Sequence, residues 1–378
     1  MKILYFTMEY FDEENAQTSG VVKKIKGQMA AMSTLGAKVE YIARMDNGVY
    51  LFAEDKRYKL CDSSGTAFFD FKEVANGLYP YIEKKRWDGI YVRYCGTNCY
   101  VLKIYKRCVQ QGIKVILEFP TYPFKKEMTQ SIRGTLIYMI TRMFNSKISK
   151  YVYKAVAYNN VDTIYGIPTI RISNGIALEG IPVTTYNHKK NINLIAIGTL
   201  EYWQGYDRLL RGLGQYYEKE NETRRGIGRI VKIDIVGDGP ETEKYREIVL
   251  ENSLQPYVRF HGRVGGESLE QIFKNASIGV NSIGCHRKGL RDVSTLKSRE
   301  FLARGLPVVF STEDSAITGI EEFAHFVSEN DEPIDIEKLI IFYDELAKNE
   351  DVSGKIRKYA ETSITWKAQM EKIYREFV

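Results

Sequence analysis

Short apolar segments alternate with longer helical segments along the whole chain, and this alternation restricts the fold more than any other feature. In the first half we expect strands at residues 3–8, 38–43, 89–94, 114–119 and 169–173. Helical stretches such as VVKKIKGQMAAMSTLG, residues 21–36, separate them. This order predicts a mostly parallel sheet covered by helices on both faces.

The second half repeats the pattern. We expect strands there at residues 192–200, 231–237, 258–262, 277–282 and 307–311. Between the halves lies ALEGIPVTTYNHKKN, residues 177–191, a polar and proline-bearing segment without a clear period that we interpret as a linker. With 378 residues, the chain is long enough for two doubly wound α/β domains, which we place at 1–180 and 190–360. Ligands of such sheets bind where the strands end, so we expect a cleft between the domains.

Composition excludes several classes of protein. No apolar run approaches the roughly 18 to 20 residues of a membrane-spanning helix, and the opening MKILYFTMEYF is typical of a buried strand rather than a signal peptide. The five cysteines show no CxxC pair and the four histidines are scattered, so we expect no disulfide framework, no metal site and a cytoplasmic location. The net charge of +6 is modest, which disfavours nucleic acid as a partner.

Two loops of the expected sheets could receive a phosphate. Ser19 and Gly20 precede the first helix, where backbone N–H groups could approach an anion. A glycine at such a position more often simply ends the loop before the helix. A nicotinamide-type GxGxxG is absent from this loop, which disfavours a dehydrogenase. In the second half, Gly237 and Gly239 lie between a strand and a helix.

The segment DVSTLKSREFLARGLPVVFS, residues 292–311, is the most specific signal. Asp292 and Glu300, with seven residues between them, stand at the front of an amphipathic helix that ends at a glycine and a proline. In this order and spacing, the second half resembles the donor-binding domain of the large retaining glycosyltransferase family of GT-B fold, family 4 or group 1. Aspartate replaces the first glutamate that is usual in that family.

The resemblance extends over nearly the whole chain. SNGIAL, residues 173–178, resembles the turn that ends the family's N-terminal domain, and ITWKAQMEKIY, residues 364–374, resembles its tryptophan-bearing C-terminal helix. It implies two Rossmann-like domains, an acceptor-binding one at 1–180 on which residues 363–378 pack back, and a donor-binding one at 190–360. The implied activity is transfer of a hexose from a nucleotide sugar to a saccharide or lipid-linked saccharide in bacterial surface or capsule polysaccharide biosynthesis. UDP-sugar is our first expectation for the donor, with no cofactor.

The residue types suit that chemistry, because a nucleotide sugar needs donors for its diphosphate and acceptors for its hydroxyls. A helix starting near Ser294 or Thr295 would turn the N–H groups of its first residues, Leu296 included, toward the diphosphate. Glu300 would accept from the ribose, and Asp292 would lie nearer the hexose. Alternatively, Asp292 caps the helix and Glu300 lies on a solvated face.

The chain departs from the family at the cations that usually hold the diphosphate. Thr199 and Gln204 stand where relatives carry an arginine and a lysine. Either the donor site has been lost or other cations substitute. Lys297 is the best substitute, and the loop cations Arg287, Lys288 and Arg291 follow. By the resemblance, Gln204 remains in the donor site, and backbone near Arg263 and Gly239 contacts the base.

The segment LEFPTYPFKKE, residues 117–127, is the candidate acceptor loop. Glu118 closes a strand, and Thr121 and Tyr122 lie between two prolines that stiffen the loop. Glu118 could equally be a buried, hydrogen-bonded acid and Tyr122 a packing residue. The resemblance implies front-face attack in which the departing phosphate takes the acceptor's proton, so no protein base is required.

The next segment, residues 125–154, is strongly basic. Apolar residues recur at helical spacing at Met128, Ile132, Leu136, Ile140 and Met143, beside many cations and one glutamate. Such a helix could lie on the anionic inner face of the plasma membrane. A helix that packs on the core with a solvated basic face has the same pattern.

Three functions remain open. The first is a hexosyltransferase. The second is a non-catalytic glycosyltransferase-like partner subunit, which the absence of the usual cation pair would suit. The third is a sugar-nucleotide epimerase, which the unclustered histidines disfavour.

Overall fold

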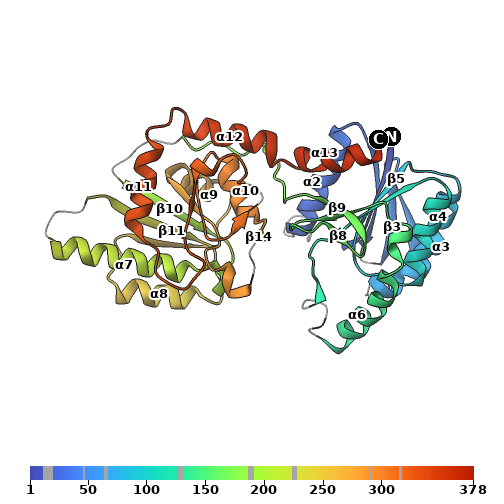
Figure 1. Ribbon diagram of the computed structural model, residues 1–378, viewed down its shortest axis with the longest axis horizontal. Helices are drawn as coiled ribbons and strands as arrows, with labels where there is room; N and C mark the ends of the chain where they lie inside the picture. The colour runs from blue at the N-terminus through green and yellow to red at the C-terminus, as the bar shows by residue number, and fades with distance from the viewer. Residues whose placement is uncertain are drawn as a thin grey trace. The chain divides into compact units, whose positions relative to one another are not determined.

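The chain folds into two compact units, seen in a computed structural model (Figure 1). Unit 1 comprises Met1–Gly175 and Trp366–Val378, and unit 2 comprises Ile176–Thr365. The structure describes residues 1–11, 20–45, 47–63, 67–125, 129, 131–185, 191–223, 228–289, 292–314 and 317–378. Ser19, Met128 and Arg291, which sequence analysis singles out, lie outside these ranges, as does part of the expected linker.

Unit 1 is built on a nine-stranded sheet with the order β4-β3-β2-β1-β5-β6-β7-β9-β8. Its strands are β1 (Lys2–Tyr10), β2 (Lys38–Met45), β3 (Gly48–Ala53), β4 (Lys56–Cys61), β5 (Gly89–Arg93), β6 (Lys114–Glu118), β7 (Lys154–Ala157), β8 (Thr163–Ile164) and β9 (Ile167–Arg171). The six strands from β2 to β9 in that order pair in parallel, whereas β3, β4 and β8 pair antiparallel.

Helices cover both faces of this sheet (Figure 1). They are α2 (Gly20–Thr34), α3 (Ala67–Glu83), α4 (Cys99–Gln110), α6 (Ile132–Asn145), the short 3₁₀ helix η1 (Ile148–Lys150) and α13 (Trp366–Phe377). Alternate side chains of β1 point to opposite faces. Leu4 and Phe6 pack with α3 and α4, whereas Ile3 and Tyr5 pack with α2 and α13. Burial on both faces explains why the parallel strands are continuous apolar runs.

The C-terminal helix α13 belongs to unit 1 because its tryptophan packs on two glycines. A Cβ added to Gly27 would lie 2.4 Å from the Trp366 ring, and one added to Gly175 would lie 2.6 Å from it. Gly175 comes from the SNG turn, so the two segments that carry the family resemblance outside the second half meet here. The Gln369 side chain also accepts a hydrogen bond from the backbone N–H of Ser173 at 2.9 Å.

Unit 2 is built on a six-stranded, all-parallel sheet with the order β12-β11-β10-β13-β15-β17. Its strands are β10 (Asn191–Ile197), β11 (Ile230–Val236), β12 (Val258–Gly262), β13 (Ile278–Val280), β15 (Val308–Phe310) and β17 (Ala324–Phe326). A separate parallel pair joins β14 (Asp292–Val293) to β16 (Glu313–Asp314). The direction of winding reverses between β10 and β13, and open α/β sheets bind ligands at the carboxyl ends of the strands at such a point.

Helices also cover both faces of the second sheet. They are α7 (Tyr206–Thr223), α8 (Thr242–Glu251), α9 (Gly266–Asn275), α10 (Leu296–Ala303), α11 (Ile336–Leu346) and α12 (Val352–Ser363), with 3₁₀ helices η2 (Tyr202–Gln204), η3 (Cys285–Lys288) and η4 (Glu321–Phe323). One core joins the sheet to α7, α8 and α11, and another joins it to α9, α10 and α12. No helix within the described part of the chain is long and apolar enough to cross a membrane.

Candidate functional site

The switch point of unit 2 is tightly packed at the backbone level. Gly198 follows β10 with a φ of +137°, and Gly237 follows β11 with a φ of +124°. A Cβ on Gly237 would lie 1.9 Å from the carbonyl oxygen of Gly198, so only glycine fits there. Gly239 is similarly confined, because its Cβ would lie 2.6 Å from the carbonyl oxygen of Leu200. These glycines let the loops after β10 and β11 approach each other.

The amine of Lys297 lies at this switch point. Its Nζ donates to the side-chain oxygen of Gln204 and, at 2.9 Å, to the hydroxyl of Tyr206. A Cβ added to Gly198 would lie 4.0 Å from the same Nζ. Tyr206 itself is fully buried and lies 3.3 Å from the carbonyl oxygen of Ile197, at the end of β10.

Gln204 is the buried partner that positions this amine. Its Nε2 donates to the backbone carbonyl of Thr199 at 3.0 Å, and its Oε1 accepts from the hydroxyl of Ser282 at 2.8 Å. Ser282 follows β13, so Gln204 joins the loop after β10 to the loop after β13. The side chain of Lys297 is thereby directed to the point between these two strands.

The surroundings of Lys297 are electrically unusual. Within the described residues, no carboxylate oxygen lies within 4.0 Å of its Nζ. Burial lowers the pKa of the Lys297 ammonium from 10.5 to about 7, and the nearby Cys285 thiol offsets this only in part. The site therefore holds an amine that would gain its full positive charge when an anion arrives.

Helix α10 begins beside this amine, at the place that the sequence predicts. Thr295 is the N-cap residue, and its hydroxyl accepts a hydrogen bond from the backbone N–H of Ser298. The same hydroxyl donates to Asn281 Oδ1 at 2.7 Å. Asn281 is buried, and its Nδ2 has no hydrogen-bond partner among the described residues. A donor of this kind needs an acceptor, which a ligand could supply.

A buried ion pair anchors α10 in this position. Arg299 Nη1 donates to Asp314 Oδ2 at 2.6 Å, and both side chains are wholly buried. The Ser298 hydroxyl donates to the same carboxylate oxygen at 2.9 Å. These contacts fix the first turn of α10 against β16, so that its backbone N–H groups have a defined direction.

The other predicted residues of this helix have different surroundings. Asp292 lies on β14, paired with Glu313, and its side chain is outside the described part of the structure. Ser294 is half-buried in the loop before α10, and Leu296 is exposed. Glu300 is half-buried, and its Oε1 accepts from Arg304 Nη2 at 3.1 Å.

Arg304 links Glu300 to a second acid. Its guanidinium donates to both carboxylate oxygens of Glu270, at 2.7 and 2.6 Å. This pairing lowers the pKa of Glu270, chiefly through the hydrogen bond from Arg304. Glu300 is thus one member of an ion-pair group at the surface, with part of its carboxylate still available to another donor.

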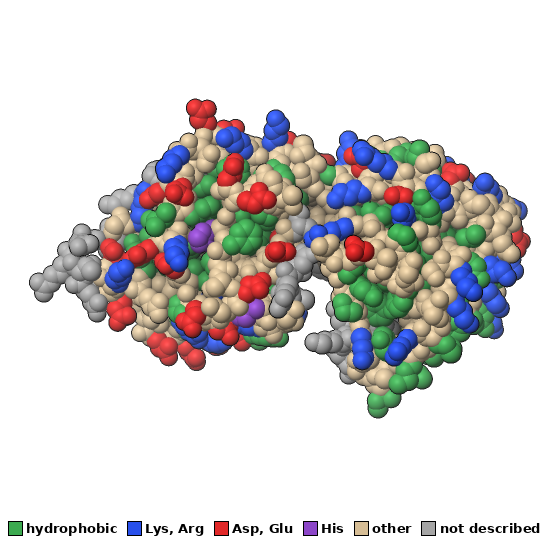
Figure 2. Space-filling view, viewed as in Figure 1, with side chains coloured by type: hydrophobic (Ala, Val, Ile, Leu, Met, Phe, Trp, Pro, Cys, Tyr) green, Lys and Arg blue, Asp and Glu red, His purple; other side chains and the backbone are tan. Residues whose placement is uncertain are grey.

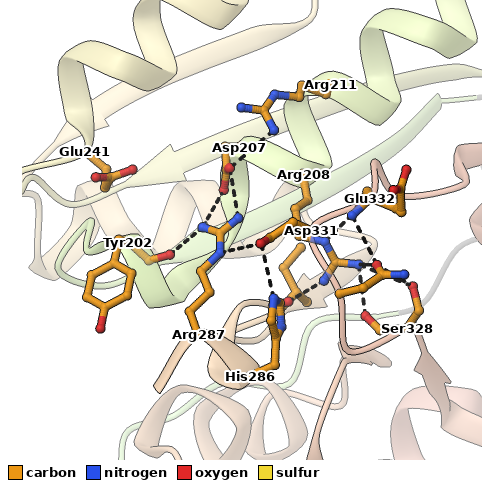
Figure 3. Close-up of polar contacts among 12 residues, drawn as sticks. Tyr202, Asp207, Arg208, Arg211, Glu241, His286, Arg287, Ser328, Asp331 and Glu332 are labelled. Carbon is orange, nitrogen blue, oxygen red and sulfur yellow. Dashed lines mark hydrogen bonds and ion pairs between the residues drawn. The ribbon is translucent and has the colours of Figure 1, made fainter. Parts of the chain in front are cut away.

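The cations of the loop at 285–288 are engaged with other side chains, and Figure 3 shows the contacts of Arg287. Arg287 donates from Nη1 and Nη2 to the two carboxylate oxygens of Asp207, each at 3.0 Å, and from Nε to Asp331 at 2.7 Å. The Lys288 amine lies 3.8 Å from the centre of the Trp203 ring. Arg287 therefore holds η3 against the start of α7. Lys297 is the better candidate to bind an anionic ligand.

Arg263 lies in the loop after the edge strand β12, and Gly239 lies in the loop after the neighbouring strand β11. Arg263 is exposed in the loop after β12. Gly239 donates its backbone N–H to Asp238 at 2.9 Å. Both positions are compatible with the base contacts that the resemblance implies, which stay a prediction.

Glu118, the predicted acid of unit 1, is wholly buried at the end of β6. Its Oε1 accepts from Arg93 and Tyr158, and its Oε2 from Tyr91, each at 2.8 Å. Burial raises its pKa, but the Arg93 and Lys24 charges and the tyrosine hydroxyls outweigh this and hold the pKa below its usual value. This geometry suits the alternative of a buried, hydrogen-bonded acid that positions its neighbours.

The candidate acceptor loop follows Glu118 directly. Thr121 is exposed, and Tyr122 is half-buried with its ring 6.1 Å from the ring of Phe119. The backbone carbonyl of Tyr122 accepts from Asn159 at 2.7 Å. In another part of unit 1, Gly20 is exposed at the first position of α2.

Sequence analysis missed three residues of the switch-point cluster, namely Tyr206, Ser282 and Asn281. The available signal was their position directly after apolar strands or their short turns, where parallel sheets place ligand-binding side chains. In the described ranges, no group of three or more His, Cys, Asp or Glu side chains is placed to hold a metal ion.

Comparisons with known proteins fit this geometry. Residues 191–341 match the model of the family described as Glycosyl transferases group 1, while curated protein sequences give no match. Sucrose-phosphate synthase from Thermosynechococcus elongatus is 16% identical, with 99% of this chain and 98% of that chain covered and a TM-score of 0.55. The lipopolysaccharide outer core galactosyltransferase WaaB is 13% identical, with 99% and 98% covered and a TM-score of 0.60. HepE from Anabaena, solved with UDP and glucose, is 12% identical, with 100% and 99% covered and a TM-score of 0.52.

At these sequence identities, the similarity to solved structures establishes the fold alone. This fold is the GT-B architecture with two sheets that the sequence predicts. The matched family model adds that unit 2 contains a glycosyl transferase domain. Fold and domain together define the class of protein, and the chain is a glycosyltransferase enzyme. The predicted fold class and enzyme class are confirmed.

Proposed function

We propose that the chain is a retaining glycosyltransferase of the family 4 type that transfers a hexose from a nucleotide sugar, with UDP-sugars as the first donors to test. One observation carries the proposal. The Lys297 amine lies among neutral partners at the switch point of a parallel sheet, beside the N-terminus of α10. Lys297 is half-buried. A cation withdrawn from water without a counter-charge is costly, and the diphosphate of a nucleotide sugar would supply that counter-charge.

The position of Lys297 also explains how a donor site can work without the family's usual cations. The resemblance places Gln204 where relatives carry the lysine, and Lys297 reaches that place from α10 by donating to Gln204 itself. A cation from another element thus takes up the position that the sequence leaves neutral. This supports substitution rather than loss of the donor site.

In the proposed step, the bond between the anomeric carbon and the diphosphate oxygen breaks as a bond to the acceptor oxygen forms on the same face. The acceptor's proton passes to the departing phosphate oxygen. Negative charge grows on the diphosphate, where Lys297, Asn281 Nδ2 and the first-turn N–H groups of α10 would stabilise it. Glu300 would accept from the ribose hydroxyls, and Asp292 would lie near the hexose.

We further propose a saccharide or lipid-linked saccharide acceptor, contacted by Thr121 and Tyr122, with Glu118 holding the strand end behind them. We propose a role in bacterial surface polysaccharide or capsule synthesis, which the likeness to WaaB, a lipopolysaccharide outer core galactosyltransferase, supports. The likeness to HepE, solved with UDP and glucose, supports a UDP-sugar donor. Because Lys297 and α10 would balance the diphosphate charge, we propose that transfer needs no resident metal. Activity that EDTA abolishes would contradict this last point.

The test begins with hydrolysis of a panel of UDP-, GDP- and dTDP-sugars, followed by transfer to cell-envelope saccharides. With the active donor at saturation, Lys297→Ala should lower kcat by about a hundredfold, because the charge it meets develops in the transition state. Lys297→Arg should restore part of the rate, since a planar guanidinium fits the place of an ammonium incompletely.

Lys338→Ala is the matched control, because this lysine lies on α11 of unit 2 with 71% of its side chain exposed and has no place in the proposed site. It should leave kcat within a few-fold of the parent. A Lys297→Ala enzyme that keeps its rate would exclude the proposed role and turn attention to Lys288, since Arg287 is held by Asp207 and Asp331.

A non-catalytic partner subunit is the second candidate, favoured by the neutral residues at Thr199 and Gln204. Thermal shift separates the enzyme from the partner subunit. A nucleotide raises the melting temperature of a protein whose donor site binds it, but not that of a protein whose donor site no longer binds nucleotide. No shift with UDP, GDP or dTDP would favour the subunit. Conversion of a nucleotide sugar without any acceptor would favour an epimerase instead.

A further inference from the structure

Helix α6 has apolar side chains on two faces, and the fold uses only one of them. One face packs on the core of unit 1 through Ile137, Tyr138 and Ile140. On the other, the exposed fractions are 93% for Ile132, 59% for Leu136, 62% for Met139 and 61% for Met143. Spacings of four, three and four residues place these four side chains on one stripe of the helix. The core-facing alternative therefore accounts for only part of the apolar pattern.

A neighbouring aromatic residue extends this stripe. Phe69 of α3 is 56% exposed, and the guanidinium carbon of Arg133 lies 5.4 Å from the centre of its ring. We call the surface formed by Phe69, Ile132, Leu136, Met139 and Met143 the α6 patch. Figure 2 shows apolar side chains gathered at the lower edge of unit 1, where Figure 1 draws α6, with lysine and arginine side chains near them. An apolar stripe of this kind on a surface helix marks an interaction site.

The charges on α6 and on the segment that follows it are of one sign. Residues 128–161 contain no Asp or Glu, but they contain five cations, Arg133, Arg142, Lys147, Lys150 and Lys154. Arg133 and Arg142 lie on opposite flanks of the stripe, because each helical residue advances by about 100°. Arg142, Lys147 and Lys150 are exposed. A surface complementary to this pattern has an apolar interior beneath a layer of negative charge.

We propose that the α6 patch docks on an anionic membrane surface. The apolar side chains enter the boundary between headgroups and acyl chains, Phe69 lies at the headgroup level, and the flanking cations meet anionic lipids. Charge complementarity selects this occupant over a second copy of the chain, because two copies would bring two cationic rims together. This docking does not depend on the transfer reaction.

The experiment is co-sedimentation of the full chain with vesicles of phosphatidylcholine alone and with about 30 mol % phosphatidylglycerol added. We expect binding to the anionic vesicles only, and strong weakening when salt rises from about 50 mM to about 500 mM. The double variant Leu136→Glu, Met139→Glu should lower the apparent partition coefficient about tenfold or more. Arg142→Gln should lower it about fivefold at low salt, since one cation near the surface is worth that much.

Leu250→Glu is the matched control, because Leu250 on α8 in unit 2 is 63% exposed and lies outside the α6 patch. It should bind vesicles like the parent, and all variants should melt within about 2 °C of it, since exposed residues are changed. Failure of the parent to pellet, or equal loss in both glutamate variants, would overturn the proposal. So would a change from dimer to monomer in sedimentation velocity with the Leu136 and Met139 variant, which would identify an interface between copies.

Discussion

The affinity for UDP should fall about fiftyfold between about pH 7 and about pH 9, because the Lys297 amine must be protonated to meet the diphosphate. With a pKa of about 7 in the free protein, about half of the molecules carry this proton at pH 7 and about one in a hundred at pH 9. A bound diphosphate returns the pKa toward 10.5, so the complex stays protonated over this range. The terminal phosphate of UDP, with a second pKa near 6, is largely ionised throughout.

Isothermal titration calorimetry in two buffers of different ionisation enthalpy measures the affinity for UDP and the number of protons taken up on binding. Binding should take up about half a proton at pH 7 and nearly one at pH 9. In Lys297→Met the proton uptake should disappear and the affinity should no longer change with pH, whereas Lys338→Ala should keep the parent's profile. A parent whose affinity for UDP does not change with pH, or a Lys297→Met variant with the same slope, would refute the assignment.

The lowered pKa of Lys297 also predicts how the stability of the fold depends on pH. The unfolded chain binds this proton up to about pH 10.5, but the folded chain releases it near pH 7. The cost to stability is therefore fully present below about pH 7 and disappears as pH rises toward 10.5. Lys297→Met should raise Tm by about 3 °C or more near pH 7, and the gain should shrink by about pH 10. An unchanged Tm at pH 7 would show that the amine is solvated.

Further substitutions separate ligand contacts from structural pairs. Glu300→Ala should weaken nucleotide-sugar binding while changing the free energy of unfolding by less than about 1 kcal/mol, because its ion pair is partly exposed; a large loss of stability with unchanged affinity would make Glu300 structural. Arg287→Ala should lower the free energy of unfolding of unit 2 by about 3 kcal/mol, since it leaves the buried Asp207 carboxylate poorly paired, and urea unfolding measures this. Arg93→Met should cost unit 1 about 3 to 5 kcal/mol, and adding Glu118→Gln should recover part of it if the lost charge pairing is the cause.

The parallel strands could be read from the sequence because they are buried on both faces and form continuous apolar runs. The five strands expected in the second half correspond to β10, β11, β12, β13 and β15. The start of α10 was equally local, since Thr295 caps it by bonding to a backbone N–H three residues on. These features depend on near neighbours in the chain.

The hairpin of β3 and β4 was missed for a physical reason. Its two turn residues, Glu54 and Asp55, adopt positive φ values of 52° and 59°, where Asn-Gly or Asp-Gly is the usual signal. The three-residue strand β17 and the four-residue strand β7 are too short to show a period. β17 pairs at the edge of its sheet, and β7 pairs between β6 and β9, so neighbouring strands rather than their own composition place them.

The properties of the cations were decided by tertiary structure. Lys297 and Arg287 both appear in the sequence as candidate phosphate ligands, yet Asp207 engages Arg287 across 80 residues of chain. Gln204 positions Lys297 across 93 residues, without supplying a charge. Likewise, the apolar period of α6 predicted a helix but not which of its faces would be covered. Local sequence sets backbone conformation, whereas the pKa of a lysine and the exposure of a stripe depend on groups that only the folded chain brings near.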